Sequence, residues 1–120
     1  MTNLLEAIVG AGPGPDPLFP HAPAGWSAEA AERLARDEGL DFGEDHREAV
    51  RALQEYWARH EPSAVHLREL HDALEEKFHR KGGVKYLYML FPGGPVAQGC
   101  RLAGLKAPAG AVDKGFGSVA

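Results

Sequence analysis

The stretch KGGVKYLYMLFPGGPVAQGCRLAGL, residues 81–105, decides the fold of this chain. Apart from one lysine, residues 84–91 are apolar at odd and even positions alike, so they predict a short buried element. We take this element to be a helix that ends at the Pro-Gly-Gly turn that follows. Pro95 suits the first position of a second helix, because the N–H group that proline lacks would have no partner there. This second helix is predicted to run through Cys100 and to end near Gly104.

Three more amphipathic helices are predicted upstream of this stretch. Ser27 can cap the first, which covers residues 28–38, because its hydroxyl can accept a hydrogen bond from a free N–H of the first turn. The second covers roughly residues 44–60 and begins with two acidic residues, which favour a helix N-terminus. The third follows the break at Pro62, and its leucines recur at helical spacing until about His79.

The pattern as a whole predicts a mainly α protein, a small orthogonal bundle of about five helices with a flexible C-terminal arm. Residues 1–25 are dense in Gly and Pro in their second half and are interpreted as an N-terminal arm. Residues 26–104 would form the helical domain, and residues 105–120, which have few large apolar groups, the C-terminal arm.

Composition narrows the class of protein. The chain is 44% hydrophobic and 25% charged, which is ordinary for a soluble globular domain. No apolar run approaches the roughly 20 residues that span a bilayer, and the first ten residues do not resemble a secretory signal. The single cysteine cannot form an internal disulfide, which fits a reducing compartment. We therefore expect a cytoplasmic protein with no membrane partner.

The charge is distributed unevenly. Residues 1–80 hold 8 Lys and Arg against 16 Asp and Glu, a net charge of −8, whereas residues 81–120 hold 5 against 1, a net charge of +4. Non-specific nucleic-acid binding depends on neutralising phosphates, so an acidic body disfavours direct nucleic-acid contact. The second and third helices could be taken for a helix-turn-helix, and a DNA-binding regulator is kept only as the weakest alternative.

Motifs for metals, cofactors and independent catalysis are missing from the pattern. His66 and His71 are five residues apart, a spacing that places them on different faces of a helix, so we expect no metal site. No phosphate-binding glycine loop follows a strand, so we expect no cofactor. No nucleophile and base pair can be assembled, which argues against an enzyme that acts alone.

Cys100 is the residue most open to interpretation. Taken alone, a cysteine is more often a small buried hydrophobe than a reactive group. A reactive thiol needs its thiolate form, which nearby positive charge favours and apolar burial disfavours. Arg101 adjoins it in the sequence, and Lys85 and Lys106 are candidates to lie near it, so these three residues are predicted to stabilise the thiolate or to bind a partner.

The central stretch also resembles a known family. The matching residues are Lys81-Gly82, Lys85-Tyr86-Leu87-Tyr88, Leu90-Phe91-Pro92, Gly94-Pro95, Gln98, Cys100-Arg101 and Ala103-Gly104-Leu105. This order is similar to the KG, KYLY, LFP, GP, Q, C-[KR] and AGL signature of DsrC/TusE proteins, the sulfite reductase gamma-subunit-like sulfur-relay proteins. A weaker collinear similarity extends it to roughly residues 26–112. Relatives carry a β-hairpin near the N-terminus, which makes a short hairpin an expectation for this chain as well.

The resemblance implies a sulfur carrier that works with other relay proteins in tRNA 2-thiolation or with a sulfite-reductase-like complex. Cys100 matches the upstream of the two arm cysteines of DsrC, whereas Ala111 stands at the position of the terminal one. A disulfide, or a sulfur bridged between two arm thiols, needs two sulfurs, so this chain alone can form neither. The chain also continues for eight residues beyond Val112, where relatives end.

Two functions follow from the resemblance. The leading one is a relay carrier in which Cys100 holds sulfur as a persulfide or mixed disulfide, closer to a sulfurtransferase-type carrier than to a stand-alone enzyme. The alternative is a regulatory paralogue that binds sulfur-relay or sulfite-reductase partners without transferring sulfur.

Overall fold

The computed structural model describes residues 16–61 and 64–111, and within them the predicted mainly helical fold is confirmed. No strand occurs in these residues. All five predicted helices are present, with ends within one or two residues of the expected positions. They are α1 (Ala28–Asp37), α2 (Glu44–Arg59), α3 (Leu67–Lys77), α4 (Val84–Leu90) and α5 (Pro95–Ala103), with a 3-10 turn, η2 (His79–Lys81), between α3 and α4.

Local capping explains where the first two helices begin. The Ser27 hydroxyl accepts a hydrogen bond from the Ala30 N–H at 3.1 Å, as predicted for α1. At the start of α2, the N–H of Gly43 donates to Nδ1 of His46 at 3.2 Å, and the two acidic residues of the first turn complement the helix dipole. The Ser27 cap and the acidic first turn of α2 depend only on neighbouring residues, which is why the sequence pattern predicts them, whereas the bond from Gly43 to His46 was not predicted.

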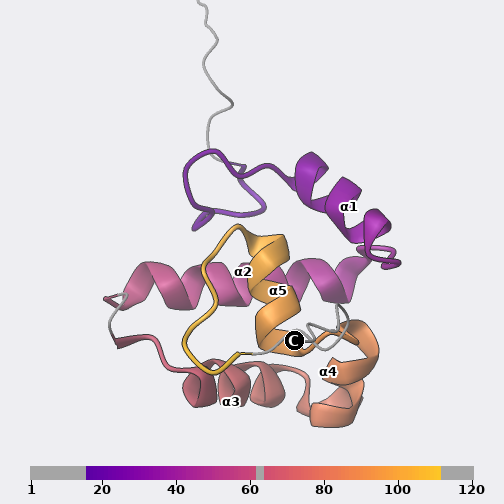
Figure 1. Cartoon of the computed structure of the whole chain (residues 1–120), viewed down its shortest axis with the longest axis vertical. Coiled ribbons are helices and arrows are strands. Elements are labelled where there is room, and N and C mark those ends of the chain that lie inside the picture. The colour runs from indigo at the N-terminus through magenta and orange to yellow at the C-terminus, as the bar shows by residue number, and fades with distance from the viewer. Residues whose placement is uncertain (1–15, 62–63, 112–120) are drawn as a thin grey trace, which may run out of the picture.

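The helices cross one another in an orthogonal arrangement. In Figure 1, α2 and α3 run side by side, and α5 crosses α2 steeply. α5 packs chiefly against α2 and also contacts α1, α3 and α4, so it is the central element of the bundle. Eight of its nine residues are buried. The C-terminal part of the stretch 81–105 therefore lies inside the molecule.

The core is built from the apolar faces of all five helices and from residues of the loops between them. α2 contributes a stripe at helical spacing, and α5 supplies small side chains that let its backbone approach the others closely. Core side chains exposed by no more than 1% include Ala35, Phe42, Ala49, Val50, Leu53, Leu70, Leu74, Leu87, Phe91, Cys100, Leu102 and Ala103.

The described part of the N-terminal arm, residues 16–25, has turns but no helix or strand, and it is packed on the bundle. The Phe19 side chain is only 2% exposed, and its ring lies 4.7 Å from that of Trp26 and 5.3 Å from the Arg51 guanidinium carbon. The last part of the predicted arm thus contributes to the core. Residues 1–15, where a hairpin was expected, lie outside the described residues, and the domain boundary at residue 25 stays a prediction.

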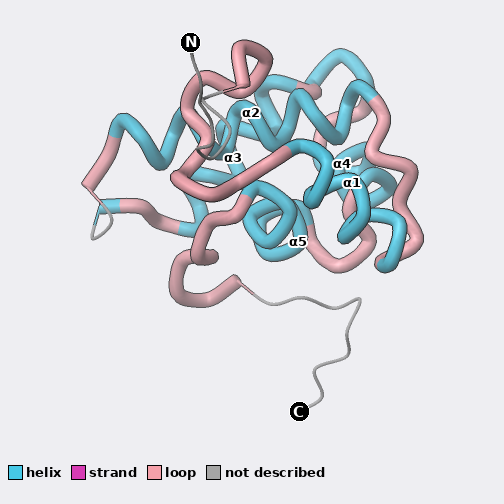
Figure 2. Tube along the Cα trace, turned by 90° about the horizontal axis from the view of Figure 1, so that it is seen from above, coloured by secondary structure: helices cyan, strands magenta, loops and turns pink. Residues whose placement is uncertain are grey.

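The segment after α5 has no regular secondary structure as far as residue 111, where the description ends, as Figure 2 shows. It turns away from the helix and runs back along the bundle toward α3. Among the described helices, none combines the length and apolar character that a membrane crossing needs.

Candidate functional site

Cys100 lies in the second half of α5 and is fully buried, with 0% of its surface exposed. Gly99 beside it allows α2 to approach closely, because a Cβ atom at this position would lie 2.8 Å from Cδ1 of Leu53. α5 is therefore locked against α2 around the sulfur. In this structure the thiol is closed off from a partner.

Burial raises the pKa of the Cys100 thiol to about 11. The main cause is desolvation, since a thiolate loses its hydration in the apolar interior. The indole of Trp57 lowers the pKa by a smaller amount, and its buried Nε1 has no other hydrogen-bond partner in the described structure. The thiol is thus almost entirely protonated at neutral pH.

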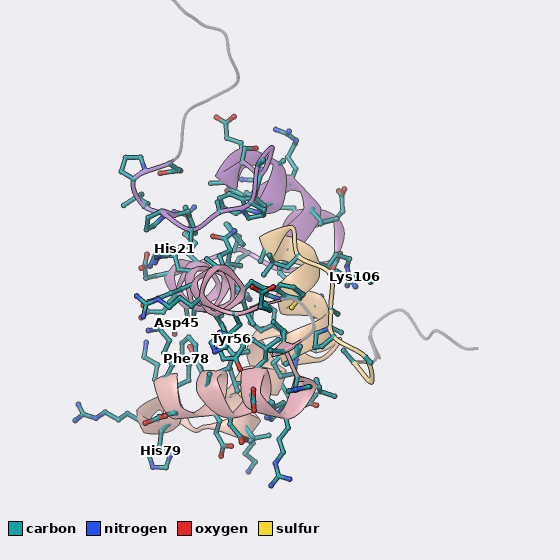
Figure 3. All side chains as sticks on the ribbon, turned by 90° about the vertical axis from the view of Figure 1, so that its left-hand side faces the viewer. His21, Asp45, Tyr56, Phe78, His79 and Lys106 are labelled. Carbon is teal, nitrogen blue, oxygen red and sulfur yellow. The ribbon has the colours of Figure 1, made fainter. Side chains whose placement is uncertain are left out.

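The residues predicted to stabilise the thiolate do not contribute to this pKa. The Arg101 guanidinium instead binds the buried carboxylate of Glu38 through two hydrogen bonds of 2.8 Å. Lys85 lies exposed on α4, and Lys106 is exposed on the segment that follows α5 (Figure 3). The structure therefore directs Arg101 toward α1 and leaves the two lysines on the surface. Their role in binding a partner stays a prediction.

Glu38 is a residue that the sequence pattern missed. Its side chain is only 5% exposed, and besides Arg101 it accepts a hydrogen bond from Nε2 of Gln98 at 2.8 Å. The Arg101 hydrogen bonds hold the pKa of this carboxyl below its usual value. The buried pair ties the end of α1 to α5 on the same helix as Cys100.

The end of α5 is held by two further side chains that the sequence did not single out. Nε1 of Trp26 donates to the Leu102 carbonyl at 2.8 Å, and Nε2 of Gln54 donates to the Ala103 carbonyl at 3.0 Å. Both carbonyls belong to the last turn, where a helix has no partner of its own for them. The one sequence feature that could have indicated these hydrogen bonds is Gln54, a polar residue on the apolar stripe of α2.

The turn that begins the C-terminal arm is joined to the cysteine backbone. Gly104 adopts the left-handed conformation, with φ 77° and ψ 23°, as its predicted role at the end of the helix requires. The next N–H group, that of Leu105, donates to the Cys100 carbonyl at 2.9 Å. The path of the arm and the position of the sulfur are thus set by the same turn of helix.

The arm leads to a groove between α3, α4 and the start of α5, with a volume of about 420 Å³. Its apolar walls include Leu67, Tyr88, Val96, Ala97 and Ala111, and Arg68, His71 and Asp72 add polar groups from α3. We call this the arm groove. Ala111, which the resemblance noted above aligns with an expected terminal cysteine, therefore lies in the arm groove and is half-buried.

One group of side chains on α3 has the geometry of a metal site. The ligand atoms of His71, Asp72 and Glu75 lie within 4.8 Å of one another. Asp72 is exposed and the other two are half-buried, and such groups are common on surfaces without an ion. The expectation that the chain binds no metal or cofactor stays a prediction.

Comparison with known proteins gives one consistent family. The family model described as DsrC like protein matches residues 18–112. The sulfurtransferase TusE of Salmonella typhimurium is 38% identical over 84 residues, which cover 69% of this chain and 76% of that protein. The sulfurtransferase TusE of Escherichia coli K12 is 37% identical over the same shares of the two chains. No solved structure gives a significant match.

Proposed function

Because this chain belongs to the DsrC-like protein family, we propose that it is a sulfur-relay carrier with Cys100 as its sulfur-bearing residue. The similarity to sulfurtransferase TusE proteins supports the relay role, and the sequence contains no other cysteine that could carry sulfur. The position of Cys100 at the base of the arm is the observation that carries the assignment of the site. Transfer within tRNA 2-thiolation is the pathway that the TusE similarity favours.

The transfer needs no external oxidant or reductant. The Cys100 thiolate attacks the outer sulfur of a persulfide on a donor protein, a new S–S bond forms, and the donor leaves as a thiolate. An acceptor thiolate then attacks the outer sulfur on Cys100, which returns to its thiolate. The proton that Cys100 gives up is taken by the departing donor thiolate or by solvent.

The closed structure sets a condition on this chemistry. With the sulfur fully buried and the pKa of the thiol at about 11, the thiolate is scarce and no donor sulfur can reach it. The partner must therefore displace the arm or the last turn of α5 before transfer. Hydration of the sulfur on opening would lower the pKa toward the ordinary value, so that exposure and activation of the thiol would occur together.

Intact-mass spectrometry tests the carrier assignment. After incubation with a persulfide-bearing protein donor, the chain should gain the mass of one sulfur atom, and a reducing agent should remove it. Cys100→Ala should gain none while keeping the helical circular dichroism of the parent. No sulfur gain on the parent with any relay donor, under conditions where a TusE relative is loaded, would refute the assignment.

Lys85 and Lys106 are proposed to bind an acidic surface of the relay partner. Both are exposed, and both belong to the basic last third of the chain, which would attract a negatively charged protein. Charge reversal of both residues should slow association with the partner and flatten its salt dependence. The same reversal of Arg59 with Arg36, exposed residues of the acidic body, is the matched control.

A second candidate function is favoured by the burial of Cys100 and by alanine at position 111. In this alternative the chain binds a relay complex or a sulfite-reductase-like complex and regulates it without carrying sulfur. The affinity for that complex would then be the same for the parent and for Cys100→Ala. A loss of binding in Cys100→Ala that preserves the fold would contradict this alternative.

A further inference from the structure

Three buried polar side-chain atoms have no oxygen or nitrogen partner in the described part of the chain, and all three lie on α2. They are Nε of Arg47, Oε1 of Gln54 and Nε1 of Trp57. A buried polar atom without such a partner is rare in a folded protein and calls for an explanation. The Trp57 atom is the one that lies beside the candidate site.

The Trp57 indole meets α5 at the turn that holds Cys100. Leu53, one helical turn earlier on the same face of α2, lies so close to Gly99 that an added Cβ atom would come within 2.8 Å of the leucine Cδ1. Gly99 directly precedes Cys100, and the Trp57 side chain hydrogen-bonds the Cys100 sulfur. The indole and the thiol therefore face each other across the contact between α2 and α5.

The other two atoms do not suit the same role. Oε1 of Gln54 is an acceptor, so it would repel a thiolate. Arg47 precedes Trp57 by ten residues, roughly 15 Å along the helix, and its guanidinium carbon lies over the Phe42 ring, 5.4 Å from the ring centre. Among the three atoms, the indole N–H is therefore the donor that is available to the sulfur.

We propose that Trp57 stabilises the Cys100 thiolate during sulfur transfer. The use of the contact rests on the proposed carrier function, whereas the contact itself does not. A neutral thiol is a weak acceptor, but a thiolate takes part in a charge-assisted hydrogen bond that is roughly twice as strong. The indole N–H thus favours the charged form of the sulfur, the role that was predicted for Arg101, Lys85 and Lys106.

The contribution of Trp57 is expected chiefly in the step that releases sulfur. When an acceptor thiolate attacks the outer sulfur of a persulfide on Cys100, a new S–S bond forms, the old one breaks, and its electron pair returns to the Cys100 sulfur. That sulfur is the leaving group, and a stabilised thiolate departs faster. An N–H group already directed at the sulfur stabilises the developing charge without having to reorient. Because Trp57 approaches from α2, displacement of the arm would leave the contact in place.

The indole N–H signals of the two tryptophans test the contact in the unloaded protein. In a nitrogen–proton correlation spectrum, Cys100→Ala should move the Trp57 signal upfield, because its N–H group loses the sulfur. Trp26, whose Nε1 donates to the Leu102 carbonyl at 2.8 Å, is the internal control, and its signal should move little. A Trp57 signal that is indifferent to Cys100→Ala would overturn the proposal. This measurement leaves Trp57 in place, so it holds even where a tryptophan variant fails to fold.

Trp57→Phe tests the effect on the thiolate. The Cβ signal of Cys100 should titrate at a pH about one unit higher than in the parent, in which the pKa is about 11, because one charge-assisted hydrogen bond is lost. Circular dichroism confirms that both chains stay folded over the pH range used. Tyr56→Phe is the matched control, because the Tyr56 hydroxyl donates to Glu69 on α3, and it should leave the titration unchanged.

The rate of sulfur release tests the role in transfer. Release from the loaded chain to dithiothreitol, followed by intact mass, should be about tenfold slower in Trp57→Phe than in the parent and in Tyr56→Phe. Equal release rates and equal titrations would show that the indole only fills space, and would overturn the proposal. If the parent cannot be loaded, the carrier function fails, and the indole signal and the titration still decide whether Trp57 stabilises the thiolate.

Discussion

α4 and α5 come from the same 25-residue stretch of sequence, yet they have opposite environments. α5 is almost entirely buried, and side chains from α1, α2 and the N-terminal segment hold it in place. α4 has a single fully buried residue, Leu87, and presents apolar side chains to solvent. The helix that carries the thiol is thus the least accessible, and the helix best placed to meet a partner carries no thiol. Sulfur transfer would therefore have to connect a partner that meets α4 with the thiol that is buried in α5.

The largest expected difference between the two regions is in thiol reactivity. The rise of the Cys100 pKa from 9.0 to about 11 alone lowers the thiolate fraction roughly 100-fold at neutral pH. Iodoacetamide should therefore react with Cys100 at least about 100-fold more slowly than with the thiol of Ala111→Cys in a Cys100→Ala background. The Cys100 rate should also rise about tenfold per pH unit until the pH nears 11. Similar rates at pH 7 would show that the thiol is accessible after all.

The next largest effect should come from the buried ion pair that holds α5. Glu38→Ala leaves the Arg101 guanidinium, about a third exposed, without its carboxylate, and should lower the free energy of unfolding by about 3 kcal/mol. Glu76→Ala, on the exposed face of α3, should change it by less than about 0.5 kcal/mol. Urea denaturation at pH 7 measures both.

The same pair predicts a direction for the pH dependence. Because the Arg101 hydrogen bonds lower the pKa of Glu38 in the folded state, the pair stabilises the fold fully above the unfolded-state pKa of about 4.5. This stabilisation is lost as the pH falls through the lower folded-state pKa. The difference in stability between the parent and Glu38→Ala should therefore shrink in acid. A difference that grows below pH 4 would contradict the assignment.

A smaller loss is expected from closing the space beside Cys100. Gly99→Ala places a methyl group 2.8 Å from Cδ1 of Leu53, so it should lower the free energy of unfolding by about 2 kcal/mol through overpacking. Leu53→Ala removes the opposing atom. The double variant should therefore lose less stability than the sum of the two single variants, which thermal denaturation can establish. Strict additivity would mean that α2 and α5 separate easily.

The smallest effect is expected on α4. Met89 is 73% exposed, so Met89→Ser should change the free energy of unfolding by less than about 0.5 kcal/mol in chemical denaturation. A larger loss would show that the Met89 side chain is covered in solution, and the contrast between the two helices would then be smaller than the described residues indicate.

The helices could be predicted from the sequence because their signals are local. Ser27, Pro95 and Gly104 act on residues within one turn, and the apolar spacing of α2 and α3 is visible in a short window. The family resemblance rested on the same contiguous stretch, and it predicted the relay class correctly at the level that the comparisons test.

The interior of the site could not be predicted, because its contacts join distant residues. Glu38 and Arg101 are 63 positions apart, and Gln54 lies 49 positions from the carbonyl that it binds. Phe19 belongs to a segment whose Pro and Gly content indicated only an arm, yet it enters the core. In the sequence, Arg101 next to Cys100 suggests a positive charge near the thiol. Only the fold reveals that the Arg101 guanidinium binds the Glu38 carboxylate instead.

The hydrogen bond from the Leu105 amide to the Cys100 carbonyl makes that amide a reporter of the closed state. If exposure of the sulfur requires the last turn of α5 to unwind, the amide proton of Leu105 must exchange with solvent through the same opening event. Its hydrogen-exchange rate would then follow the population of molecules in which the thiol is available. A relay partner that prepares Cys100 for transfer would accelerate the exchange of this one proton, and it would do so before any sulfur has moved.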